Sequence, residues 1–540
     1  MICLALTLLA TTGQAVVRTS YILTELSAYN SKLPATKRNE KYLEMEADPF
    51  AFFRGTNHLY WKDLGKSSSL VTYSSTSTKC WLSGDAHVRN IGAFSNDAGT
   101  VVFDLNDFDE SVIADYQLDV WRMAISINLM MRVNGGFSAA DRSAVVDEFT
   151  ESYLDTIEAY ATTSAEKTAV VTVSNAYGQL DEFLADVKAD ESRLAMLDEF
   201  TVKVNGVRRF KTTAQNPDLG PVTSAEYTAV VNAMTSYGLT LSGGLGYSGA
   251  HFAVKSVAER LHAGIGSLGN KRFYILIQGP STNQDDDVIL DMKAQDAPSA
   301  FLNLATADVT KTNTVTGSNA GQRVTKAYKA LSYKADDYLG YTTVTIGGTA
   351  QVYSVRERNP HKKNFDTTAL ATVNSATNMA QQWGKILATA HSRSDLDADP
   401  AVISHNFDSA VKTKIDGKHA EFRALVRSII EPYAIQVIDD YNSFLAIRAN
   451  GQLSATTDED ALPQEPQTIG LDAAGIAGII SGAAAVFLVG GLAAVVVRRR
   501  RSRNVADSEN GHMSPSSSEK DEPARLESSN PAFHHPSITV

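Results

Sequence analysis

Cysteine is nearly absent from this chain, as are glycosylation motifs and any excess of positive charge. The 540 residues contain two cysteines, Cys3 and Cys80. Because Cys3 lies in a segment that we expect to be removed, no internal disulfide and no cysteine zinc site is predicted. The chain has no Asn-x-Ser/Thr sequon, so glycosylation lends no support to a secreted topology. The net charge of -12 argues against a nucleic-acid binder, which needs a basic face.

Two apolar segments determine the expected compartment. Residues 1–15 form a short apolar run that ends in small residues, which is typical of a signal peptide, although no Lys or Arg precedes it; the alternative is a buried first helix. Residues 473–497 are uncharged over about 25 residues, which is long enough to span a bilayer. Four arginines, Arg498–Arg501, follow directly. Because positive charge flanks the cytoplasmic end of a span, we predict a single-pass type I membrane protein with its bulk in the secretory lumen or outside.

The remaining segments divide by composition. Residues 16–449 have no long low-complexity stretch and are expected to form one globular ectodomain. Residues 450–472 are polar, acidic and proline-bearing, which indicates a juxtamembrane linker, and residues 498–540 have the composition of a disordered cytoplasmic tail. Small residues recur at a spacing of four inside the span, so a homodimer packed through the span is one alternative.

Hydrophobic periodicity predicts a mixed, α+β ectodomain. The expected helices cover residues 116–131, 145–160 and 380–392. The expected strands cover residues 101–103, 273–278, 288–293 and 351–356. Because only a short polar segment separates the second and third strands, we expect them to pair as a hairpin.

A first group of polar residues follows the order that phosphoryl transfer needs. Asp85 lies in the segment Gly84–Asn90, and Asp104 ends the apolar strand that comes next. A carboxylate can accept the proton of an attacking hydroxyl, which suits Asp85 as the catalytic base. Amide and carboxylate oxygens are ligands that Mg²⁺ prefers, which suits Asn90 and Asp104. The alternative is structural, because Asp and Asn are also common turn residues.

A second group combines glycines with a lysine on a strand. The loop Gly264–Gly269 runs into one expected strand, and Lys293 lies near the end of the next. Glycines let backbone N–H groups approach phosphates, and a lysine neutralises their charge. Because this loop opens a strand rather than a helix, it favours a kinase-type over a Rossmann-type arrangement. We therefore predict nucleotide contacts at Gly264, Gly266, Ser267, Gly269 and Lys293, although a strand lysine can also be merely solvated.

Several strings of residues together resemble an uncharacterised, mainly bacterial family called domain of unknown function 2252. These strings are Asp48–Gly55, Gly84–His87, Phe103–Glu110, Asp119–Arg122, Gly264–Gly269, Asp337–Gly340 and Leu387–Arg393. The resemblance extends from about residue 21 to residue 444, and the string Phe103–Glu110 is the most specific part of it.

That family is in turn similar to the aminoglycoside phosphotransferases, a branch of the protein-kinase-like folds. The resemblance implies a two-lobed fold with Asp85 as catalytic base, Asn90 and Asp104 as metal ligands, and Asp119 bracing the catalytic loop. Because the glycine loop and Lys293 follow the catalytic loop instead of preceding it, the resemblance also implies a circular permutation. The part that corresponds to the N-lobe would cover about residues 250–360.

The expected function is an ATP- and Mg²⁺-dependent phosphotransferase that acts on an unknown substrate. The family usually has Glu after its lysine, whereas Ala294 follows Lys293 here, and Asp296 is the nearest substitute. An unpaired lysine would be poorly oriented, so the alternative is a catalytically inactive kinase-like binding or scaffold protein. A metal-dependent phosphoesterase is the third alternative, but the additional histidine motifs of that class are missing.

Overall fold

The computed structural model describes residues 17–212, 214–241, 252–261 and 264–453. Contacts between residues divide the chain into two units, Met1–Ala461 and Leu462–Val540, and every described residue belongs to the first. The expected signal peptide, span and tail, and residues 454–472 of the expected linker, lie outside the described residues. Among the helices of the described ranges, none combines the length and the apolar character that a membrane crossing requires.

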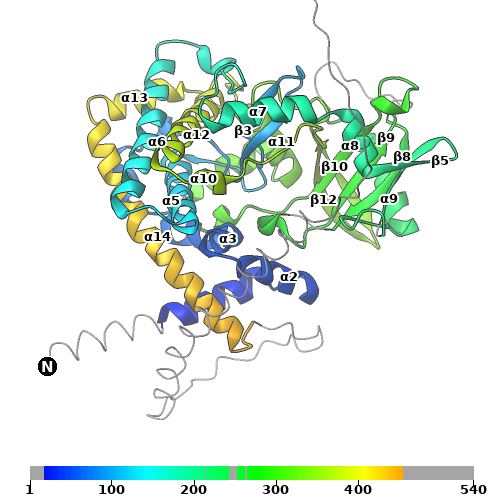
Figure 1. The fold of residues 1–540 in the computed structure, drawn as a ribbon, viewed down its shortest axis with the longest axis horizontal. Helices are drawn as coiled ribbons and strands as arrows, with labels where there is room; N and C mark the ends of the chain where they lie inside the picture. Colours follow the sequence, from blue (N-terminus) through cyan, green and yellow to red (C-terminus); the bar gives the residue numbers. More distant parts are fainter. Residues whose placement is uncertain (1–16, 213, 242–251, 262–263, 454–540) are drawn as a thin grey trace, which may run out of the picture. The chain divides into compact units, whose positions relative to one another are not determined.

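Helices are the most abundant elements of the described chain (Figure 1). Residues 17–30 are helical. The labelled helices are α2 (Ala35–Met45), α3 (Pro49–Gly55), α4 (Asn57–Leu64), α5 (Gln117–Asn134), α6 (Ala139–Tyr160), α7 (Gln179–Asp190), α8 (Arg193–Phe200), α9 (Ser224–Gly238), α10 (Thr306–Thr316), α11 (Ala320–Leu331), α12 (Val373–Arg393), α13 (Phe407–Ile415) and α14 (His419–Ala449). Local signals explain where α3 starts: Asp48 accepts a hydrogen bond from the Ala51 N–H at 2.7 Å, and Pro49 is the first residue of the helix.

The strands form one six-stranded antiparallel sheet and three two-stranded ribbons. The sheet has the order β11-β12-β10-β9-β8-β7, and the ribbons pair β1 with β4, β2 with β3, and β5 with β6. The strands are β1 (Lys79–Leu82), β2 (Ile91–Ser95), β3 (Val101–Leu105), β4 (Val112–Asp115), β5 (Thr201–Val204), β6 (Val207–Phe210), β7 (Leu219–Gly220), β8 (Val254–Arg260), β9 (Arg272–Ile277), β10 (Val288–Ala294), β11 (Gly340–Ile346) and β12 (Thr349–Glu357).

The predicted helices and strands are confirmed in type and place. The three expected helices are α5, α6 and α12, and the four expected strands are β3, β9, β10 and β12. The expected hairpin is β9–β10, in which Ile277 pairs with Val288. One boundary matters for function: β3 continues to Leu105, two residues beyond the predicted end, and this places Asp104 inside the strand.

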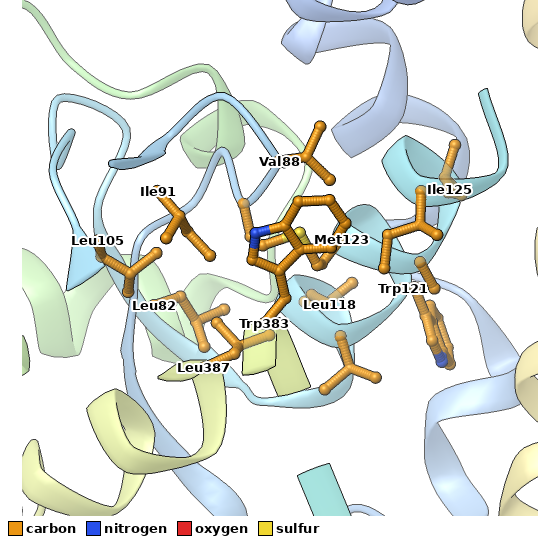
Figure 2. Packing of buried hydrophobic residues seen from close by; sticks show 14 of the residues in the cluster. Leu82, Val88, Ile91, Leu105, Leu118, Trp121, Met123, Ile125, Trp383 and Leu387 are labelled. Carbon is orange, nitrogen blue, oxygen red and sulfur yellow. The ribbon is translucent and has the colours of Figure 1, made fainter. Parts of the chain in front are cut away.

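The helical core packs directly beneath the segment that connects β1 to β2. Helix α12 contacts α6 and β1, and α14 contacts α5 and α6. Figure 2 shows Trp383 of α12 among the side chains of Val88, Leu118 and Met123. All four side chains are buried. The segment Gly84–Asn90 therefore rests on a close-packed base, which fixes its backbone.

The six-stranded sheet has one apolar face and one mixed face. Helix α9 covers the first, where Phe273, Ile275 and Leu290 are buried. On the second face, Leu276 and Ile289 pack against residues of α8 and β6. Beyond them, the same face presents charged residues of β9, β10 and β12 to a cleft.

Candidate functional site

The turn that begins the candidate catalytic loop requires glycine. Gly84 has φ +76°, in the left-handed region. A Cβ atom at this position would lie 1.9 Å from the carbonyl oxygen of Glu110. The loop and the string Phe103–Glu110 therefore approach each other more closely than any side chain at residue 84 would allow.

Asp119, on α5, braces this loop from below, as the family resemblance implies. Its carboxylate accepts hydrogen bonds from the backbone N–H groups of Ser83 at 2.7 Å and Gly84 at 3.1 Å. His391, at the end of α12, lies 3.4 Å from the same carboxylate. Asp119 and His391 are both fully buried, so these contacts fix the direction in which the loop leaves β1.

The carboxylate of Asp85 points into the cleft and pairs with Arg122. The Arg122 Nε donates to Asp85 Oδ1 at 2.6 Å, and the His87 Nε2 lies 3.8 Å from Asp85 Oδ2. Burial raises the pKa of Asp85 to about 6, against the opposing charge of Arg122. A carboxylate with this pKa is ionised at neutral pH yet basic enough to accept a proton from a hydroxyl. Sequence reasoning did not assign Arg122, although it lies three residues after Asp119 on the same helix.

Asn90 is oriented by the backbone of the loop. Its side-chain Nδ2 donates to the backbone carbonyl oxygen of Asp85 at 2.9 Å. The backbone carbonyl oxygen of Asn90 accepts the Asn106 N–H at 3.0 Å. Because Nδ2 is the donor, Oδ1 is the atom that Asn90 can offer to a cation. Asn90 and Asp85 both line the cleft.

The glycine loop lies beside Asp85. It connects β8 to β9, and Ile265–Ser267 form one turn of 3-10 helix. A Cβ atom on Gly266 would lie 3.9 Å from Asp85 Oδ2. Gly264 and Gly266 line the cleft. Gly269 has φ +97° and faces Leu33, away from Asp85.

Lys293 finds its acidic partners in the string Phe103–Glu110. Its ammonium forms an ion pair with Asp109 and lies 3.8 Å from Asp107. Asp296, the partner considered from sequence, instead pairs with Lys32 at 2.6 Å. The absence of Glu after Lys293 is therefore compensated by carboxylates that sequence order places far away.

Asp104 contacts the backbone of its own strand and Arg393. Its Oδ1 accepts the Leu105 N–H at 2.8 Å, and its Oδ2 is 3.8 Å from Arg393 Nη1. Burial raises the pKa of Asp104 to about 6, and Arg393 opposes the shift. Asp85, Asn90 and Lys293 line the cleft, whereas Asp104 is not among its lining residues.

Asp107, Asp109 and Glu110 of the same string all line the cleft. Asp109 pairs with Lys293, and Glu110 accepts hydrogen bonds from Ser299 and Asn57. Burial by itself would raise the pKa of Asp107, but Lys293 and Arg356 outweigh it and lower the value. Asp107 lies two positions after the end of β3. The last backbone hydrogen bond between this segment and the β2 side joins Asn106 to Asn90, so the chain leaves the β2–β3 ribbon at Asp107. Asn90 Oδ1 and the Asp107 carboxylate are hard oxygen donors of the kind that suits Mg²⁺.

The cleft has a volume of about 440 Å³, which suits a small molecule. Its sheet side is ionic: Arg272 donates to Asp291 through Nε at 2.6 Å, and Arg356 donates to the Asn106 carbonyl at 3.0 Å. Burial by itself would raise the pKa of Asp291, but Arg272 holds it well below its ordinary value. The cationic side chains that line the cleft are Lys32, Lys41, Arg54, Arg89, Arg260, Arg272, Lys293, Arg356, Arg358, Lys362 and Lys363.

Comparison with known proteins places the chain in a family. Residues 35–447 match the family described as "Uncharacterized protein conserved in bacteria (DUF2252)", and the chain belongs to it. This confirms the resemblance drawn from the sequence strings. No curated protein and no solved structure matches the chain.

Proposed function

We propose that this protein transfers a phosphoryl group from ATP to the hydroxyl group of a small acceptor. The observation that carries the proposal is that four residues from distant parts of the sequence line one cleft: Asp85, Asn90, Gly266 and Lys293. They are the components that phosphoryl transfer uses, namely a base, oxygen ligands for a metal, and a cationic phosphate clamp.

Each residue has a defined role in this proposal. Asp85 accepts the proton of the acceptor hydroxyl, whose oxygen forms a bond to the γ-phosphorus while the bond to ADP breaks. The glycine-loop backbone and Lys293 bind the phosphate oxygens. Asn90 and Asp107 would hold Mg²⁺, which neutralises charge on the phosphates when bound. In this assignment Asp107 takes the place of Asp104, which lies against Arg393 outside the cleft lining.

The order of elements supports a permuted kinase-like fold. Counting from β8, the glycine loop joins the first and second strands and the lysine lies on the third, as in protein kinases. The end of α12 lies beside the strand that leads into the catalytic loop, because the Trp81 N–H donates to Ser394 Oγ at 3.2 Å. In other kinase-like chains a helix precedes the catalytic loop in the sequence. In this chain α12 would take its place, although it follows the catalytic loop in the sequence.

The test is ATP turnover by the full chain with Mg²⁺, measured as phosphate release with water as the acceptor. We expect slow turnover in the wild type, a loss of at least tenfold in Asp85→Asn and in Lys293→Met, and no change in Lys311→Met, which alters an exposed lysine. Equal rates in all four proteins would contradict the proposal.

A second candidate is a protein that binds phosphorylated ligands without turning them over. The observation in its favour is the Arg122–Asp85 ion pair, which occupies one oxygen of the base. Binding of a non-hydrolysable ATP analogue that depends on Lys293, together with no turnover in any protein, would select this candidate.

We also propose the single-pass topology, which rests on the apolar segment 473–497 and the arginines after it. Protease added outside intact cells should remove an epitope tag placed directly after residue 15 and spare a C-terminal one. The reverse pattern, or extraction of the chain by carbonate, would contradict it.

A further inference from the structure

One buried lysine in the cleft has no ion-pair or hydrogen-bond partner among the described residues. Lys41, on α2, is 2% exposed and lines the cleft. Within the described ranges its ammonium makes no ion pair and no hydrogen bond, whereas Lys37, one turn earlier, bonds Glu40 at 2.9 Å. A largely buried cation without a counterion is costly, so its retention points to a group that the described residues do not supply.

The groups around Lys41 explain why it stays unpaired. Its Nζ lies 5.2 Å from the ring centroid of Tyr29, which stacks on His58 with the ring centroids 3.9 Å apart. Burial lowers the pKa of His58, and Lys41 adds to the shift, so this imidazole is neutral. The wall is therefore aromatic and offers no negative charge.

The carboxylate with the largest effect on the pKa of Lys41, Glu110, is hydrogen-bonded to other groups. Glu110 is the main group that raises the pKa of Lys41, but burial outweighs it and lowers that pKa to about 8. The Glu110 Oε2 accepts hydrogen bonds from the Ser299 N–H at 2.7 Å, from Ser299 Oγ at 2.5 Å and from Asn57 Nδ2 at 3.2 Å. Lys41 thus remains a cation at neutral pH without a carboxylate bound to it.

This position adjoins the catalytic loop. Asn57 Nδ2, which bonds Glu110, also donates to the carbonyl oxygen of Gly84 at 3.0 Å. Gly84 directly precedes Asp85, and Asp85 is among the charges that act on Lys41. The proposed function assigns Lys293 and the glycine loop to the donor phosphates. Lys41 adjoins the catalytic loop, where the acceptor hydroxyl would meet Asp85.

We propose that Lys41 binds the anionic group of the phosphoryl acceptor, which makes the acceptor a hydroxylated small molecule with a carboxylate or phosphate. This inference rests on the proposed function, because it assigns the cleft beside Asp85 to the acceptor. The Tyr29 ring would form the wall against which the carbon skeleton packs.

The test is calorimetric binding of two anions, glycerol 3-phosphate and glycerate, to the full chain without nucleotide or metal, with glycerol as the uncharged control. We expect at least one anion to bind the wild type and Lys37→Met equally, and to bind Lys41→Met at least tenfold more weakly. Glycerol should not bind. If neither anion binds the wild type, or if Lys41→Met binds as the wild type does, the inference fails. The carboxylate and phosphate arms identify which anion the site prefers.

A second measurement needs no variant. Pyridoxal phosphate forms an imine with an amine and releases water, and borohydride reduction fixes the adduct for peptide mapping. We expect Lys41 to be labelled and the anion that binds to protect it; labelling that the anion leaves unchanged would contradict the inference. Because these measurements omit ATP and Mg²⁺, a loss of ATP turnover with anion binding intact would overturn the proposed function alone.

Discussion

Asp119→Ala removes the acceptor that holds the catalytic loop, and the structure allows its cost to be worked out. The substitution leaves the buried N–H groups of Ser83 and Gly84 without a partner. Each unsatisfied buried donor costs roughly 1–3 kcal/mol, so we expect a loss of about 2–5 kcal/mol in the free energy of unfolding. Asp119→Asn keeps one acceptor oxygen and should lose about half as much.

The assay is urea unfolding followed by tryptophan fluorescence and by circular dichroism, whose midpoints should coincide if a single free energy is to be extracted. Trp81 and Trp383 are buried in the helical core and report on it. Asp439→Ala is the matched control, since Asp439 is exposed on α14 and should change stability by less than about 0.5 kcal/mol. A change of that small size in Asp119→Ala would refute the reasoning.

Three further predictions follow from the charges. Because the pKa of Asp85 is raised to about 6 and the base acts when ionised, turnover should rise about tenfold per pH unit below 6 and level off above it; a flat profile there would contradict its role. The pKa of Asp104 is raised to about 6 from about 3.9 in the unfolded chain, so its stabilising contribution is full well below pH 4 and lost as pH rises through 6. Urea titrations should show Asp104→Asn gaining about 2 kcal/mol on the wild type between pH 4 and pH 7, and a constant difference would refute this. On the sheet face toward the cleft, α8 and β6 cover the apolar part, and the rest carries the Arg272–Asp291 pair, which among the described residues leaves no apolar surface there for a nucleobase. Calorimetric affinities for ATP, GTP and tripolyphosphate should therefore agree within about tenfold. A preference of a hundredfold or more for ATP would reveal a base pocket.

Sequence patterns predicted several helices and strands, and five of the eight predicted site residues line the cleft, because these features depend on local signals. The periodicity of residues 116–131 and the loop between Gly264 and Gly269 are of this kind. The partners of Lys293 could not be predicted, because Asp107 and Asp109 reach it only through the packing of the string Phe103–Glu110 against the sheet.

Asp104 stays a predicted metal ligand, and its position inside β3 shows a second limit of sequence reasoning. The apolar run ends at Phe103, which suggests that the next residue leaves the strand. Cross-strand pairing with β2 carries the ladder on to Leu105, and this pairing is a non-local effect. Lys41 was not noticed at all, since a lysine on an amphipathic helix gives no sign in the sequence of being buried without a partner.

We propose that Asp107, and not Asp104, joins Asn90 in holding the metal that accompanies the phosphates. The most direct measurement is electron paramagnetic resonance of Mn²⁺ titrated into the full chain with a non-hydrolysable ATP analogue, in the wild type, Asp107→Asn and Asp104→Asn. We expect Asp107→Asn to weaken Mn²⁺ binding at least tenfold, and we expect folded Asp104→Asn to bind Mn²⁺ as the wild type does. Equal binding by Asp107→Asn and the wild type, or a loss confined to Asp104→Asn, would contradict it.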